Sequence, residues 1–121
     1  MEKIAGYTDE KLLREHPVIM QRMIITNTGT AVLELERGSV LGAGEGGIKV
    51  FFATGLTEAL GILAEPVTVP AKSGSVNGEA HVAVYVHGDF VADQLKFAAS
   101  ATDADKAVAL TSLKLMGCYA S

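Results

Sequence analysis

The 121-residue sequence has a single cysteine, Cys118, and this scarcity rules out two kinds of stabilising site. One thiol cannot form a disulfide within the chain, and it cannot build a metal site from several cysteines. Long apolar runs are lacking as well, since none approaches the roughly 20 residues that a helix needs to cross a bilayer. We therefore expect no membrane span.

Two further absences concern where the protein is made and what it binds. Residues 1–7 contain no basic region followed by a long apolar core, so we expect no secretory signal and a protein that stays in the cytoplasm. The ten Lys and Arg residues are scattered singly, and fourteen Asp and Glu residues bring the net charge to −4. Without a basic stripe, we expect no nucleic-acid partner.

Aromatic residues are also scarce, at 6% with no Trp, although hydrophobic residues make up 49% of the chain. The apolar side chains are thus mainly Ala, Val, Leu and Ile, spread over a body that is large enough for only one domain. In so small a body some of this apolar surface stays exposed in a monomer. We therefore expect the protein to associate with a partner or with copies of itself.

Several segments show the period-two alternation of apolar and polar residues that is typical of strands. The clearest is 81–87, in which Val82, Val84 and Val86 alternate with other residues, and Gly88-Asp89 is expected to end it. Weaker candidates are 33–36 and 48–52, and a β-branched stretch at 18–27 predicts an extended arm. Pro66 and Pro70 restrict the short apolar runs 59–64 and 67–69 to a sheet edge or a bend.

Helix signals lie at the two ends of the chain. Thr8 begins a possible capped turn that Pro17 must end. Thr102, followed three residues later by Asp105, resembles a capping box. An apolar face then follows at Ala109, Leu110, Leu113 and Met116, and Gly117 is the expected stop, with Cys118-Tyr119 extended after it.

Many short strands, frequent turns and one late helix predict a mainly β fold. The expected form is a small β-barrel or bent-ribbon (β-clip-like) domain with one short C-terminal helix. We expect residues 1–30 to be a partly extended N-terminal arm and residues 31–121 to be a single β-rich domain.

The stretch Gly42–Gly47 satisfies the dinucleotide-binding pattern G-x-G-x-x-G, with Glu65 at roughly the spacing of a ribose-binding acid. That motif works because a helix N-terminus points at the pyrophosphate, and here the next segment, Ile48–Phe52, has the pattern of a strand. The glycines therefore predict a hairpin or surface loop, and we expect no cofactor.

Metal binding and catalysis are weakly supported. His81 and His87 share a strand face but are six residues apart, about 20 Å at a rise near 3.3 Å, so they cannot hold one ion together. Glu79 with His81, or His87 with Asp89, would need a third ligand from another strand, and the alternative is that they are solvated polar residues. Cys118 has no neighbouring base, which favours a structural role. No nucleophile elbow, P-loop or H-E-x-x-H pattern occurs, so the sequence predicts no enzyme.

Four segments between Arg37 and Tyr119 follow one another in a distinctive order. They are Gly38-Ser39-Val40-Leu41-Gly42, Ala59-Leu60-Gly61-Ile62-Leu63-Ala64-Glu65, Val84-Tyr85-Val86-His87-Gly88-Asp89-Phe90 and Leu113-Lys114-Leu115-Met116-Gly117-Cys118-Tyr119. In this order the first three resemble the family of the phage lambda head decoration protein, and the fourth is similar to the closing helix and extended tail of that family. The resemblance does not extend to residues 1–30.

The resemblance implies a virion structural protein that performs no chemistry. It implies a β-rich homotrimer on the outer surface of the expanded head of a bacteriophage, with the major capsid protein as partner. It also implies an N-terminal segment that reaches the capsid, and we expect the β-prone stretch to supply the contact residues. An ordinary core strand is the alternative for that stretch. The expected contact residues are Val18, Ile19, Met20, Met23, Ile24 and Ile25.

Two other functions stay open at this point. One is a small β-barrel enzyme or ligand carrier with a metal held by Glu79, His81, His87 and Asp89. The other is a bacterial scaffold or secretion component that forms a ring without any capsid.

Overall fold

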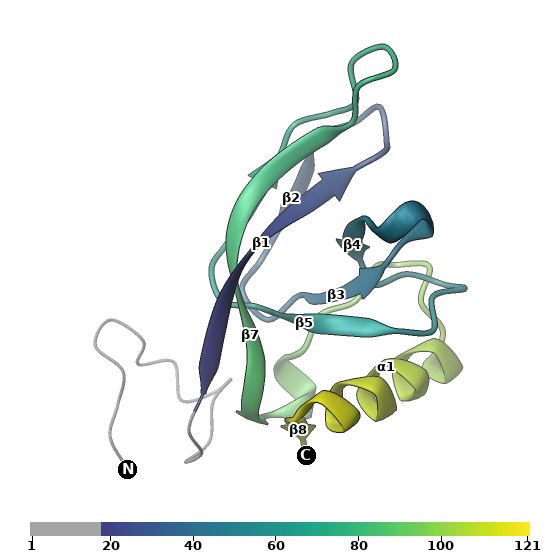
Figure 1. Cartoon of the computed structure of the whole chain (residues 1–121). Coiled ribbons are helices and arrows are strands. Elements are labelled where there is room, and N and C mark those ends of the chain that lie inside the picture. The colour runs from purple at the N-terminus through teal and green to yellow at the C-terminus, as the bar shows by residue number, and fades with distance from the viewer. Residues whose placement is uncertain (1–17) are drawn as a thin grey trace.

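The computed structural model describes residues 18–121, and it confirms a mainly β domain with one C-terminal helix (Figure 1). The helix predicted from Thr8 lies outside the described residues. One α-helix, α1 (Asp103–Met116), and two 3-10 turns, Glu45–Gly47 and Ala92–Gln94, accompany the strands. The strands are β1 (Ile19–Asn27), β2 (Leu33–Leu35), β3 (Val40–Ala43), β4 (Lys49–Phe51), β5 (Ala59–Leu63), β6 (Val67–Val69), β7 (Gly78–Phe90) and β8 (Cys118–Ala120).

The long strand β7 organises the main sheet. The strand order is β1-β7-β5-β3-β4, with β8 added to β7, and β2 pairs with β6 in a separate two-stranded sheet. β1 is antiparallel to β7 over its whole length, and Figure 1 shows the two as one long twisted ribbon that β3 and β5 cross. β1 and β4, at the two ends of the strand order, come into contact, so the sheet curls into a half-barrel.

β7 separates two hydrophobic clusters. The ribbon-side core contains Val82 and Val84, together with Ile25 of β1. The helix-side core contains Tyr85, the residue next to Val84, together with Leu113 of α1. The alternation predicted from the sequence is therefore real, but in this part of β7 both faces are buried, because α1 covers the second one.

The predicted end of the strand at Gly88-Asp89 is wrong, since β7 continues to Phe90. It continues because β8 adds to it in parallel, with Gly88 opposite Cys118, and the Gly88 N–H donates to the Gly117 carbonyl at 3.0 Å. Gly88 is needed for close packing rather than for a turn. A Cβ there would lie 2.9 Å from Val18 Cγ1 and 3.0 Å from the Phe90 ring.

The capping box predicted for the C-terminal helix is confirmed. Thr102 Oγ1 accepts from the Asp105 N–H at 3.2 Å, and Asp105 Oδ2 accepts from the Thr102 N–H at 2.8 Å. The helix ends as expected at Gly117, whose φ of 102° is a left-handed conformation that favours glycine. Ala109 and Leu113 are its buried residues.

The restriction of the two apolar runs to a sheet edge or a bend is wrong for residues 59–64, because β5 lies inside the main sheet and pairs with both β3 and β7. Pro66 lies beyond the end of β5 and does not interrupt its ladders. The bend itself is present. β5 ends at Leu63, and the chain leaves the main sheet before β6, which pairs only with β2. Two further bonds extend the contact with β7 beyond the end of β5. The Ala64 N–H donates to the Ala83 carbonyl at 2.9 Å, and Glu65 Oε2 accepts from the Ala83 N–H at 3.1 Å.

Candidate functional site

The glycine-rich stretch is a hairpin loop, as predicted. β3 and β4 are antiparallel neighbours, and the Gly44 N–H donates to the Ile48 carbonyl at 2.8 Å to close the connection. The connection contains a three-residue 3-10 turn, and a strand follows it. The loop therefore presents no helix N-terminus to a pyrophosphate.

The polar residues of β7 are not assembled around a common point. His81 lies opposite Ile24 of β1 and is exposed, whereas the His87 ring packs edge-on against Tyr119 of β8 at 6.5 Å between centroids. Within residues 18–121 there is no group of three His, Cys, Asp or Glu side chains placed to hold a metal ion. Within that range no helix is long and apolar enough to span a bilayer either.

Cys118 lies in the helix-side core and is 1% exposed. Its Sγ lies 3.9 Å from the Tyr85 carbonyl, a weak hydrogen bond. Burial raises the pKa of the thiol to about 12, so the group stays protonated at neutral pH. Because the thiolate is the reactive form, this environment makes Cys118 a poor nucleophile.

The six residues of the predicted contact segment lie in β1 or immediately before it, and they divide by exposure. Ile19, Met20 and Ile24 are 56%, 37% and 41% exposed. Val18 packs against the helix-side core, while Met23 packs against the ribbon-side core, to which the fully buried Ile25 belongs. β1 is thus a strand of the protein's own sheet that also presents large apolar side chains to solvent.

β1 is an edge strand, and this is the structural property that suits it to binding. Among residues 18–121 it pairs with β7 on one side and has no strand partner on the other. An unpaired edge carries free N–H and C=O groups that another extended chain can use. The edge therefore offers main-chain hydrogen bonds next to exposed Ile19, Met20 and Ile24.

A shallow groove of about 470 Å³ lies beside β1. Four residues of β1, 21–24, line it together with Lys49 of β4 and His81 of β7. Arg22 and Lys49 give the groove positive charge, and no carboxylate is among its lining residues. The groove is built from three strands that are far apart in the sequence, so sequence reasoning identified only the β1 part of it.

Sequence reasoning also missed a second group of exposed apolar side chains. Leu115 and Val108 of α1 are 86% and 41% exposed, and Val32 and Val76 in two loops are 58% and 68% exposed. Leu115 is close in sequence to the residues of the predicted apolar face of the helix. A helical projection places it away from that face and so indicates that it is exposed. The two valines are isolated in polar loops, where the sequence gives no signal.

Comparison with protein families relates the chain to a known family. The chain matches the family model described as bacteriophage lambda head decoration protein D over residues 5–118. The match begins well before Thr30, so it extends into the N-terminal region that the resemblance noted from the sequence did not reach. No curated protein matches the chain.

Proposed function

The chain belongs to the family of the bacteriophage lambda head decoration protein D, and from this premise we propose that it binds the outer surface of the expanded phage head as homotrimers and stabilises the shell. The partner in this proposal is the major capsid protein, and the location is the virion surface. No catalytic step is part of the function.

The observation that supports a binding role best is the open edge of β1 with its exposed apolar side chains. Ile19, Met20 and Ile24 are the residues that we propose for the capsid contact, and Val18, Met23 and Ile25 support them from the two cores. We also propose that residues 1–30 act as the capsid-contact unit, with β1 as the part of it that is integrated into the sheet of the 31–121 domain.

The charge of the groove along β1 narrows the kind of capsid segment that fits. Arg22 and Lys49 line it without a carboxylate, although the chain as a whole carries a net charge of −4. An extended segment with acidic and apolar residues would pair its backbone with β1 and place its carboxylates beside these two cations. Backbone pairing then supplies affinity, and the side chains supply selectivity.

Stabilisation of the shell follows from binding alone. Three linked contacts on one trimer bind neighbouring capsid subunits together, so each additional contact is intramolecular and the trimer is held by avidity. A ligand that prefers the expanded shell shifts the equilibrium toward it by mass action. The decorated shell then resists disruption more strongly than the bare one.

Co-sedimentation with expanded, undecorated capsids and with unexpanded procapsids of the same phage tests this proposal. We expect saturable binding to the expanded shells alone, near one copy per capsid subunit. Absence of binding to both kinds of shell would contradict the decoration role.

A matched pair of variants tests the site. Ile24→Asp places a carboxylate in the β1 groove and is expected to weaken binding at least tenfold, about 1.4 kcal/mol or more. Thr68→Asp places the same charge on an exposed position of β6, outside this groove, and is expected to bind normally. Equal binding by the two variants would remove β1 from the contact while leaving the decoration role intact.

A further inference from the structure

We propose that neighbouring copies in the trimer meet head to tail, with the loop tip of one copy seated in the groove beside α1 of the next. The tip consists of residues 28–32 and 70–77, which connect β1 to β2 and β6 to β7. The helix groove is the hollow between α1 and the start of β5. This inference rests on the proposed trimer and identifies the surfaces that form it.

Asn27, a buried residue, joins the two loops of the tip at their base. Its side-chain N–H groups donate to the carbonyls of Ala31 at 2.8 Å and Pro70 at 3.1 Å, and its Oδ1 accepts from the Gly29 N–H at 2.9 Å. The Lys72 N–H donates to the Gly29 carbonyl at 2.8 Å and joins the two loops. The tip is therefore preorganised for binding, so docking orders little additional backbone.

The tip presents apolar side chains to solvent. Val32 is 58% exposed and Val76 is 68% exposed, and Lys72 is the single charged residue in the two segments of the tip. Loops that only connect strands are usually polar, because exposure of apolar side chains to water is unfavourable. The tip thus carries two exposed valines and one cation among otherwise small or polar residues.

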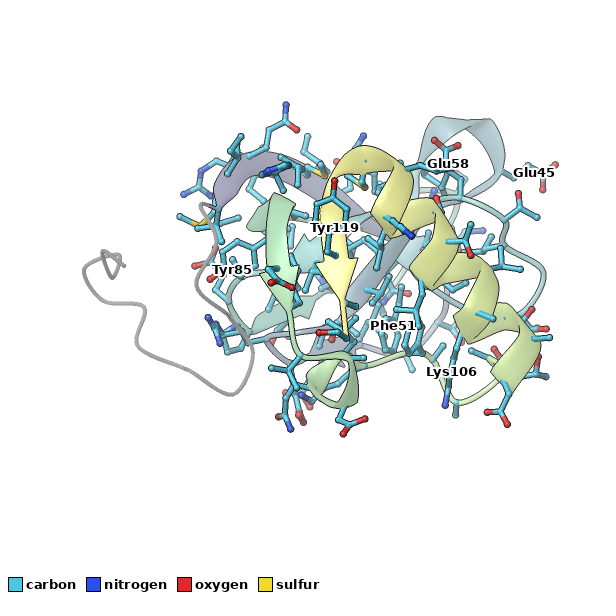
Figure 2. The ribbon with its side chains drawn as sticks, turned by 90° about the horizontal axis from the view of Figure 1, so that it is seen from below. Glu45, Phe51, Glu58, Tyr85, Lys106 and Tyr119 are labelled. Atoms are coloured by element: carbon cyan, nitrogen blue, oxygen red, sulfur yellow. The ribbon has the colours of Figure 1, made fainter. Side chains whose placement is uncertain are left out.

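The helix groove has matching chemistry. Its volume is about 600 Å³, and among its lining residues are Val108 and Leu115, which are 41% and 86% exposed. Glu58 is the single charged residue of its lining and lies beside α1, as Figure 2 shows. Ser112 Oγ accepts from the Ala59 N–H at 2.8 Å and fixes the wall of the groove. A hollow with exposed apolar side chains and one carboxylate thus complements a tip with two exposed valines and one ammonium group.

The two surfaces lie on opposite sides of the chain, since the tip is at the top of Figure 1 and α1 is at the bottom. A single copy cannot bring them together, so a contact between them can form only between two copies. Contacts between two different patches of the same chain are heterologous, and a closed ring such as a trimer is built from contacts of this kind. The β1 edge is outside both patches and stays available to the capsid.

Charge reversal tests the contact. Lys72→Glu, Glu58→Lys and the double variant are compared with the wild type by sedimentation velocity over a concentration series, and on expanded capsids by carbodiimide cross-linking with mass spectrometry. Each single reversal is expected to weaken self-association at least tenfold. The double variant, in which the two charges are exchanged, is expected to recover to within about threefold. Asp93→Lys, at an exposed position of the second 3-10 turn, is the control and is expected to associate normally.

Cross-linking covers the case in which wild-type copies associate only on the shell. A Lys72–Glu58 cross-link between copies on the capsid supports the contact even if the free protein is a monomer. If the wild type associates in solution, the proposal is overturned when the single reversals associate like it or when the double variant recovers nothing. If the wild type associates only on the shell, the proposal is overturned when no such cross-link forms there. Normal capsid binding in those cases would leave the decoration role standing, so the two proposals fail separately.

Discussion

Ser112 of α1 accepts a hydrogen bond from the backbone N–H of Ala59, the first residue of β5, at 2.8 Å. This contact fixes the helix against the half-barrel at a point where β5 is buried. Substitution of Ser112 by Ala leaves the Ala59 N–H without its partner. We expect the free energy of unfolding to fall by about 1–3 kcal/mol, measured by urea denaturation. Thr111→Ala, on the exposed side of the same turn, is the control, and an equal loss in both variants would show that the hydrogen bond contributes nothing.

Substitution of Asn27 by Asp, which has nearly the same shape, tests whether the side-chain hydrogen bonds of Asn27 order the loop tip. Asn27→Asp replaces an amide that donates to the Ala31 and Pro70 carbonyls by a carboxylate oxygen that cannot donate. We expect a loss of at least about 1–3 kcal/mol in the free energy of unfolding at neutral pH, and faster hydrogen exchange of the Lys72 amide. Thr28→Asp, on an exposed neighbour, introduces the same charge without this loss. Unchanged exchange at Lys72 in Asn27→Asp would mean that Asn27 does not order the tip.

Part of the stability that the capping box provides is lost when the pH becomes acidic. Hydrogen bonds from Thr102 hold the pKa of Asp105 below its ordinary value of 3.8. A carboxyl whose pKa is lowered by folding stabilises the folded state above the unfolded pKa, and this contribution disappears as the pH falls through the folded value. We expect Asp105→Asn to be less stable than the wild type near pH 6, and the difference to shrink as the pH falls below about 3.8. A difference that is constant from pH 6 to pH 2 would argue against the charged cap.

Burial of Cys118 predicts that stability also depends on pH in the alkaline range, where it falls as the pH rises. The thiol of the unfolded chain ionises near its ordinary pKa of 9.0, whereas burial raises the folded pKa to about 12. Between these values the unfolded state loses a proton that the folded state keeps, so stability falls as the pH rises above 9. We expect Cys118→Ala, compared with the wild type, to show a shallower decline between pH 9 and 11. Parallel declines in the two proteins would contradict the shifted thiol.

The same burial predicts slow labelling of Cys118. A thiolate-directed reagent at pH 8 should modify the folded protein only as fast as the helix-side core opens, and urea should accelerate the reaction. The unfolded protein is the control and should react at once. Rapid, complete labelling of the folded protein would show that Cys118 is accessible.

Much of the fold was predictable because its signals are local. Alternation at Val82, Val84 and Val86 predicts β7, and Thr102 with Asp105 predicts the start of α1, because both patterns depend on residues that are near one another in the chain. The extension of β7 past Gly88 depends on parallel pairing with β8, whose residues follow α1 in the sequence. A local sequence pattern cannot predict that β8 pairs with β7.

The candidate site was predictable only in its linear part. Residues 18–25 were identified because they form one β-prone segment, but the sequence could not show which of them face solvent. Exposure of Met20 and burial of Ile25 are decided by the curl of the sheet and by which core lies beneath each position. Lys49 and His81 join the groove from other strands, and their approach is a property of the tertiary fold.

The position of β7 between β1 and β8 also sets the order in which the molecule can be completed during synthesis. β7 is followed by α1 before β8 is made, and Cys118 belongs to the same core as Val40 and Tyr85. A nascent chain that has reached only Phe90 can form the β1–β7 ribbon, but one face of Tyr85 then lacks the covering that α1 provides. The helix-side core is therefore complete only after α1 and β8 have been made, and until then the half-built sheet leaves apolar surface uncovered.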